Sequence, residues 1–175
     1  VIAADNVSHF VIQDITLNRI NSTSSNDEVF ILKGDTDVSG LKDVYRFTIR
    51  NVHVQSNKTA ALAEIGVGYA MEACYLGTVE NMIVQDCETG LRMVQRTGRT
   101  TGVNAVSFTG GEIQSCANAA YLQDVANVGF YATTFEGTTA SGVWLNGECN
   151  GVGFYNTYTE GLASYDFRLS DTEGL

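Results

Sequence analysis

The sequence VGFYATTFEG occupies residues 128–137, and VGFYNTYTEG occupies residues 152–161. Seven of the ten positions are identical, and the two copies lie 24 residues apart. A copied segment at a period of about 20 to 50 residues is typical of solenoid proteins, in which each repeat is one structural unit stacked on the next. The duplication therefore indicates that the chain is built from repeats.

The apolar spacing of these two segments recurs four times earlier in the chain. The matching segments are VSFTGGEI (106–113), GTVENMIV (77–84), FTIRNVHV (47–54) and FVIQDITL (10–17). Successive copies are offset by 37, 30, 29, 22 and 24 residues, which gives six repeats of uneven length. Within each copy an alternating apolar pattern stops at one residue and then resumes. We expect a backbone bend at these six positions, which are Asp14, Asn51, Asn81, Gly110, Ala132 and Asn156.

A second short apolar segment follows the first in most repeats. It reads FIL (30–32), LRM (91–93), AYL (120–122), VWL (143–145) and FRL (167–169). No segment shows a sustained period of 3.6 residues, and the glycines of residues 58–71 argue against a helix there. The sequence therefore predicts an all-β protein. We expect the core to contain Val128, Phe130, Phe135, Val143, Leu145, Val152, Phe154, Phe167 and Leu169.

Several short strands in each repeat resemble the right-handed single-stranded parallel β-helix, a solenoid, of the pectin-lyase-like superfamily. The irregular coils and the polar Ser, Thr and Asn turns are most similar to those of bacteriophage tailspike proteins. The resemblance covers most of residues 6–171 and implies about six irregular coils. The acidic signatures of pectate lyases and polygalacturonases are absent. A β-sandwich and a propeller are the rival folds.

The tailspike resemblance also carries expectations about the whole protein. It implies a homotrimer that is extracellular or lies on the virion surface, as part of a phage tail. We expect residues 1–175 to form a single β-helix domain, as a fragment of a longer chain. Open ends of a solenoid expose apolar core and unpaired backbone, so we also expect the isolated fragment to associate.

The composition excludes several classes of partner. The formal net charge of −10 over 175 residues opposes binding to nucleic acid and to anionic membranes. No apolar run approaches the roughly 20 residues of a membrane span, so we expect no membrane insertion. The four cysteines lack metal-binding spacing, and the glycine-rich stretches do not precede a helix. We therefore expect no metal site and no cofactor, and we expect the cysteines to be buried free thiols.

Stacked repeats place equivalent residues about 4.8 Å apart, so outward-facing residues form columns. On the last three repeats three such columns combine into a patch of Glu112, Tyr131, Glu136, Tyr155, Tyr158 and Glu160. Aromatic rings pack against the apolar faces of sugars, and carboxylates bind sugar hydroxyls. The sequence therefore predicts that Tyr131, Tyr155 and Tyr158 bind saccharide. The alternative is that these are ordinary surface residues of strands.

The same patch contains candidates for catalysis. Glu136 and Glu160 are one repeat apart, which places their carboxyl groups near the 5 to 5.5 Å separation of retaining glycosidases, an approximate value. We therefore expect this pair to hydrolyse a glycosidic bond if the protein is an enzyme, with Glu112 as an alternative partner. A polysaccharide lyase would instead use a basic residue, and Arg50 and Arg92 are the outward-facing candidates.

Trp144 is the only tryptophan, and the alternation of its strand turns it outward. Three explanations are open for it, namely a contact between subunits, saccharide binding and cover by a loop. The function that these observations favour is recognition of a bacterial surface polysaccharide, with hydrolysis by a polysaccharide depolymerase as an extension. The alternatives are a non-enzymatic structural shaft or adhesin module, and a polysaccharide lyase.

Overall fold

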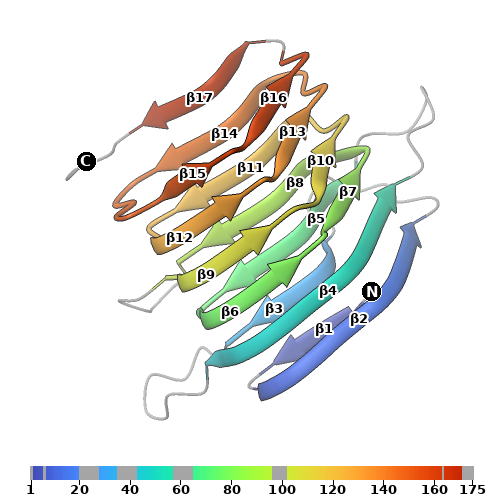
Figure 1. Ribbon diagram of the computed structural model, residues 1–175, viewed down its shortest axis with the longest axis vertical. Helices are drawn as coiled ribbons and strands as arrows, with labels where there is room; N and C mark the ends of the chain where they lie inside the picture. The colour runs from blue at the N-terminus through green and yellow to red at the C-terminus, as the bar shows by residue number, and fades with distance from the viewer. Residues whose placement is uncertain are drawn as a thin grey trace.

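The computed structural model describes residues 2–5, 7–19, 28–34, 43–56, 65–95, 102–162 and 164–170. Every regular element in these ranges is a β-strand, and every strand pairs in parallel with its neighbours. The strands follow one another along the long axis of the molecule from the N-terminus to the C-terminus (Figure 1). The predicted all-β class is therefore confirmed.

The described strands form two sheets. The seven-stranded sheet contains, in order, β1 (Ile2–Asp5), β3 (Glu28–Lys33), β5 (Ile65–Glu72), β8 (Cys87–Val94), β11 (Asn118–Gln123), β14 (Ser141–Asn146) and β17 (Tyr165–Ser170). The ten-stranded sheet is built around two long strands, β2 (Ser8–Arg19) and β4 (Val44–Ser56), which pair with each other.

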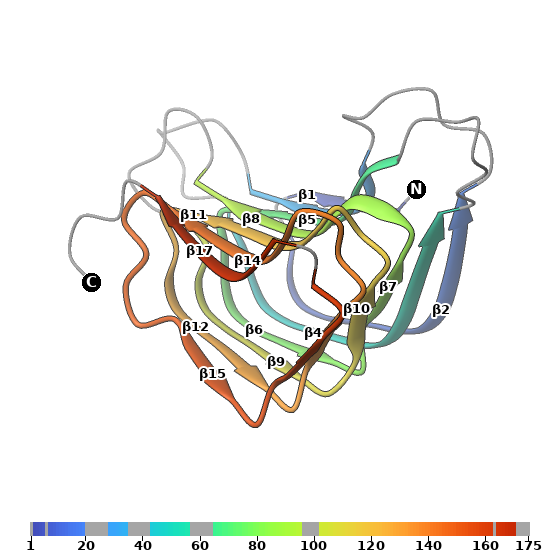
Figure 2. The ribbon, with the colours of Figure 1, turned by 90° about the horizontal axis from the view of Figure 1, so that it is seen from above.

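Beyond β4 the ten-stranded sheet divides into two arms. One arm pairs with the first half of β4 and contains β6 (Cys74–Glu80), β9 (Asn104–Thr109), β12 (Ala126–Tyr131) and β15 (Gly153–Tyr155). The other arm pairs with the second half and contains β7 (Ile83–Gln85), β10 (Glu112–Gln114), β13 (Thr134–Glu136) and β16 (Tyr158–Glu160). Viewed along the stack, the two arms meet at a corner that points away from the seven-stranded sheet (Figure 2).

The chain passes alternately through the two sheets, so each repeat contributes to both. The six repeats are β2–β3, β4–β5, β6–β8, β9–β11, β12–β14 and β15–β17. The predicted alignment of the repeats is confirmed residue by residue, because Phe10, Phe108 and Phe130 pair with Phe47, Val79 and Phe154, respectively. The architecture is that of stacked repeats of parallel strands, and it is compatible with a parallel β-helix.

The core lies between the sheets and contains columns of stacked side chains. Phe130 lies between Phe108 and Phe154, with ring centroids 4.8 and 5.2 Å away and nearly parallel planes, and Phe135 meets its edge. Stacked rings of this kind add dispersion and quadrupole attraction to the burial of apolar area. All four cysteines are buried free thiols, as expected.

The predicted core is confirmed for Val128, Phe130, Phe135, Val143 and Leu145, which are all buried. Val152 and Phe154 are only partly buried. The prediction was wrong for Phe167 and Leu169, whose exposed fractions are 44% and 56%. The alternation of β17 is as expected, since Phe167 packs edge-on against Phe154. However, β17 pairs only with β14 within the described residues, so no further strand covers these side chains.

The predicted column of bend residues is confirmed. All six of its residues have a positive φ, between 51° and 65°, which is uncommon for residues other than glycine. The side chains also form a ladder, in which the Asn51 amide donates to Asp14 (2.8 Å) and the Asn81 amide donates to Asn51 (3.2 Å). Asn and Asp tolerate the left-handed region better than most residues, so the sequence signal has a direct physical cause.

Other corners of the repeats also adopt positive φ. One column contains His9, Arg46, Leu76, Ala105, Asn127 and Gly151. Another contains Asp86, Ser115, Gly137 and Gly161. The first of these columns did not stand out in the sequence, because Arg46, Leu76 and Ala105 are not typical residues of left-handed turns. Stacking therefore imposes one corner geometry on every repeat, whichever residue occupies the position.

Candidate functional site

Tyr131 on β12 and Tyr155 on β15 are paired neighbours on the outer surface of one arm of the ten-stranded sheet. Their rings stack with centroids 4.8 Å apart and planes 8° apart. Both remain exposed, by 42% and 54%. The structure therefore brings these two predicted residues together. Stacking occupies one face of each ring, so the hydroxyl groups and the remaining ring surface are left for a ligand.

Glycine explains how these rings are held. A Cβ atom on Gly129 would lie 2.6 Å from Cε2 and 2.9 Å from the hydroxyl oxygen of Tyr131. Gly153 has the same relation to Tyr155, at 2.7 and 2.8 Å. Each tyrosine thus leans back along its own strand across the glycine two residues earlier. The duplicated Gly-Phe-Tyr therefore places, at successive positions, a glycine that leaves room for the surface ring, a core ring, and the surface ring itself.

A shallow pocket adjoins the tyrosine pair. Its volume is about 210 Å³, and it is lined by Asn127, Gly129 and Tyr131 from one repeat and by Gly151, Gly153 and Tyr155 from the next. The tyrosine rings and the two glycines that they cover form part of its wall. No predicted glutamate lines the pocket.

Glu136 and Glu160 are paired neighbours on β13 and β16, in the other arm. The Tyr158 hydroxyl donates a hydrogen bond of 2.7 Å to the Glu160 carboxylate, and this bond raises the pKa of the hydroxyl. Tyr158 is 55% exposed. The structure therefore brings these three predicted residues together as a second cluster.

The corner of the sheet separates the two clusters. Tyr131 ends one arm and Thr134 begins the other, with Ala132 at positive φ between them. The outer surfaces of the arms face in different directions (Figure 2). The tyrosine pair and the glutamate pair therefore flank a convex edge, whereas small-molecule sites are usually concave.

Glu112 occupies a different column from the other two glutamates. It pairs with Ile83 on one side and Thr134 on the other, while Glu136 pairs with Gln114. Glu112 is thus diagonal to Glu136 and belongs to the column that leads through Thr134 to Tyr158.

Trp144 lies apart from all of these residues, on β14 in the seven-stranded sheet. It is half-buried, with the edge of its ring system meeting Tyr121 (4.9 Å between centroids) and the Arg168 guanidinium 4.0 Å above it. Its indole N–H donates to the Ser170 hydroxyl (2.7 Å). Within the described residues, side chains of the neighbouring repeats therefore contact the ring of Trp144 and accept its N–H hydrogen bond.

Both candidate bases for a lyase reaction are engaged in ion pairs. Arg50 bonds to Glu80 (2.7 Å), and this hydrogen bond raises the pKa of Arg50 and lowers that of Glu80. Arg92 pairs with Glu28 and lies 3.5 Å from Glu72. A base at neutral pH needs a lowered pKa, which is the opposite of the shift at Arg50.

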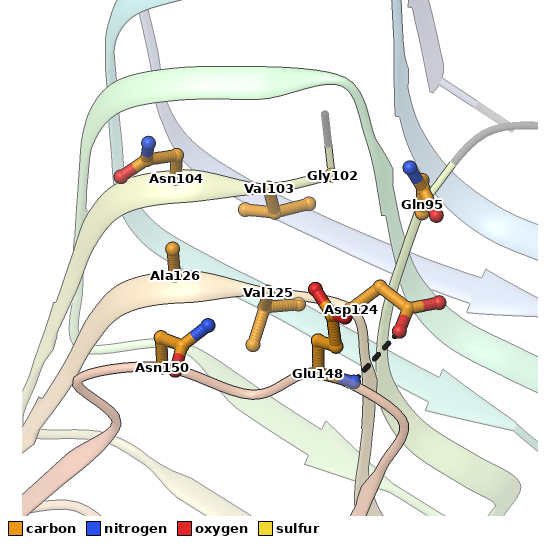
Figure 3. A pocket seen from close by; sticks show the side chains of 9 residues that line it. All are labelled: Gln95, Gly102, Val103, Asn104, Asp124, Val125, Ala126, Glu148 and Asn150. Carbon is orange, nitrogen blue, oxygen red and sulfur yellow. Dashed lines mark hydrogen bonds between the residues drawn. The ribbon is translucent and has the colours of Figure 1, made fainter. Parts of the chain in front are cut away.

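A larger pocket of about 430 Å³ was not identified from the sequence (Figure 3). It lies where the chain enters β9, β12 and β15, and Asn104, Ala126 and Asn150 line it on three successive repeats. Asp124 and Glu148 add carboxylates, and an Asp124 oxygen accepts a hydrogen bond from the Glu148 backbone N–H (2.8 Å). Its residues lie where one strand ends and the next begins, and they form no recognisable sequence motif.

Within the described ranges, no group of three or more His, Cys, Asp and Glu side chains could hold a metal ion. No helix in those ranges is long and apolar enough to cross a membrane. Comparisons of the chain with protein-family models, curated proteins and solved structures find no match in any of the three.

Proposed function

We propose that this chain is a right-handed single-stranded parallel β-helix that binds a polysaccharide, in the manner of the tailspike proteins it resembles. The observation that carries the proposal is the exposed Tyr131–Tyr155 stack beside a pocket that Gly129 and Gly153 help to line. Tyrosine offers both an apolar ring and a hydroxyl, which is the combination that a sugar ring with many hydroxyls requires. Water-bridged hydrogen bonds suit such a shallow surface.

Hydrolysis is the catalytic extension of this proposal. Glu136 and Glu160 would act as the pair of carboxylates, with the Tyr158 hydroxyl orienting Glu160 through its hydrogen bond. The convex corner places this pair beyond the tyrosine pocket, so cleavage would require the polysaccharide to bend around the corner. Binding is therefore the primary function and cleavage the secondary one.

An array of purified bacterial surface polysaccharides of known composition tests the proposed binding. The 175-residue chain, with its β-structure verified by circular dichroism, is applied to the array, and we expect saturable binding to a subset of polysaccharides. Absence of binding to every polysaccharide would contradict the proposal and favour a structural shaft. Cleavage is measured separately by release of reducing ends, and we expect Glu136→Gln and Glu160→Gln to abolish any release while Asp166→Asn, outside both pockets, retains it.

We also propose a homotrimer exposed outside the cell or on a virion. The exposed apolar side chains of Phe167 and Leu169 support association, because apolar area of this kind is usually covered in solution. Sedimentation at increasing protein concentration tests it, and a monomer at all concentrations would contradict it.

A further inference from the structure

The two pockets of the outer surface adjoin each other along the chain. The larger pocket is lined by Ala126 and Asn150, and the pocket beside the tyrosines by the next residues, Asn127 and Gly151. The Asn127 amide donates to the Asn104 side-chain oxygen (3.1 Å), which ties the lining of one pocket to that of the other. The two pockets are therefore neighbours along the direction of β12, and together they are called the track, which ends at the tyrosine pair.

The described lining of this track is polar and acidic. Asn104 and Asn150 supply amides, and Asp124 and Glu148 supply carboxylates. No Lys, Arg or His is among the described residues that line either pocket. The larger volume, about 430 Å³, falls in the usual range of small-ligand sites.

Acidic residues outnumber basic ones in the part of the chain that supplies most of the described lining. Residues 102–170 contain six acidic side chains and one basic side chain, Arg168. The acidic residues are Glu112, Asp124, Glu136, Glu148, Glu160 and Asp166. The guanidinium of Arg168 lies over Trp144 on the seven-stranded sheet. A carboxylate on a ligand in this track would therefore meet repulsion from the Asp124 and Glu148 carboxylates that line it.

We propose that the two pockets hold consecutive units of one saccharide chain, and that these units are uncharged or amino sugars and not uronates. This inference rests on the proposed polysaccharide binding. The amides and carboxylates accept hydrogen bonds from sugar hydroxyls or from an ammonium group, and the tyrosine pair packs against the unit at the end of the track. The saccharide then runs along the strand direction, across the axis of the stack.

The composition of the polysaccharides that bind tests this choice of ligand. The array contains repeat units of neutral hexoses, of amino sugars and of uronates, and we expect binding to the first two classes at affinities at least about tenfold above the third. Binding confined to uronate polysaccharides would overturn the inference while leaving polysaccharide binding intact. No binding at all would instead overturn the proposed function.

Variants test the track itself against the polysaccharide that binds best. Asn150→Trp fills the larger pocket and should weaken binding at least about tenfold, whereas Thr139→Trp, an equally large change at an exposed turn outside both pockets, should not. Glu148→Lys should reduce the discrimination against uronates, and Asp166→Lys makes the same change of charge elsewhere as a control. Unchanged binding in Asn150→Trp would overturn the two-pocket track.

Discussion

The ring of Tyr131 lies across Gly129, with its Cε2 atom 2.6 Å from the point that a Cβ on the glycine would occupy. Tyr155 repeats this relation with Gly153 one repeat later. A glycine within a strand usually weakens it, because it loses more backbone entropy and packs no side chain. Here a surface ring covers the glycine, and the same contact fixes the direction of the ring. The duplication in the sequence therefore encodes a surface as well as a core.

Gly129→Ala should displace the Tyr131 ring without removing it. The added methyl group occupies the space of the ring, so the ring rotates away and its stack with Tyr155 is lost. We expect a changed near-ultraviolet circular dichroism spectrum in the tyrosine region. Ser107→Ala, in the same column one repeat earlier, is the matched control and should leave the spectrum unchanged. A Gly129→Ala spectrum identical to that of the wild type would contradict the contact between Gly129 and the Tyr131 ring.

Ala132→Gly should stabilise the protein. Ala132 is exposed and has a φ of 52°, which costs a residue with a Cβ about 1 to 2 kcal/mol. Glycine removes that cost but loses roughly 0.5 to 1 kcal/mol of backbone entropy, so a net gain of about 0.5 to 1 kcal/mol in the free energy of unfolding is expected. Urea denaturation measures it. A loss of stability equal to that of Thr139→Gly, at an exposed position without positive φ, would refute the explanation.

Phe130→Ala should destabilise the protein by about 3 to 5 kcal/mol, because the ring is fully buried among three other phenylalanines and its loss leaves a cavity. Phe167→Ala should cost less than about 2 kcal/mol, because this ring is 44% exposed. Denaturant unfolding of the two variants gives both values. Equal losses of stability in the two variants would contradict the burial of Phe130 and the exposure of Phe167.

Glu160→Gln should lower the pKa of the Tyr158 hydroxyl. The hydrogen bond to the carboxylate, and then its charge, raise this pKa in the folded protein. The stabilisation is therefore fully present below the unfolded tyrosine pKa of about 10, and it is lost as the pH rises through the higher folded value. Titration of the Tyr158 ring carbon signal by NMR measures the shift. Glu136→Gln should lower the pKa less, since Glu136 acts only through its charge. No shift in Glu160→Gln would contradict the contact.

The sequence predicted those features that depend on a repeated apolar pattern. The pairings of Phe10, Phe108 and Phe130 followed from that pattern, because a shift by one residue would turn every buried side chain outward. The bend column was predictable because Asn51 and Asn81 have a known tolerance of left-handed backbone.

Other features could not be predicted from the pattern. Leu76 and Ala105 adopt positive φ only because the stack imposes it. The exposure of Phe167 depends on which strand lies beyond β17, and the larger pocket depends on backbone at three strand entries. The bend at Ala132 was predicted, but the angle between the outer surfaces of β12 and β13 was not, since column alignment shows which residues stack and not how neighbouring surfaces are inclined.

The affinity of the tyrosine pair for polysaccharide tests the central claim most directly. Isothermal titration with the polysaccharide that binds best compares the wild-type chain, the Tyr131→Ala and Tyr155→Ala double variant, and the corresponding double Phe variant. Truncation of both rings removes the apolar area that would pack against the sugar, so the Ala variant should bind at least about tenfold more weakly. The Phe variant retains the rings and should stay within about threefold of the wild type. Undiminished affinity in the double Ala variant would contradict the claim that this surface binds saccharide.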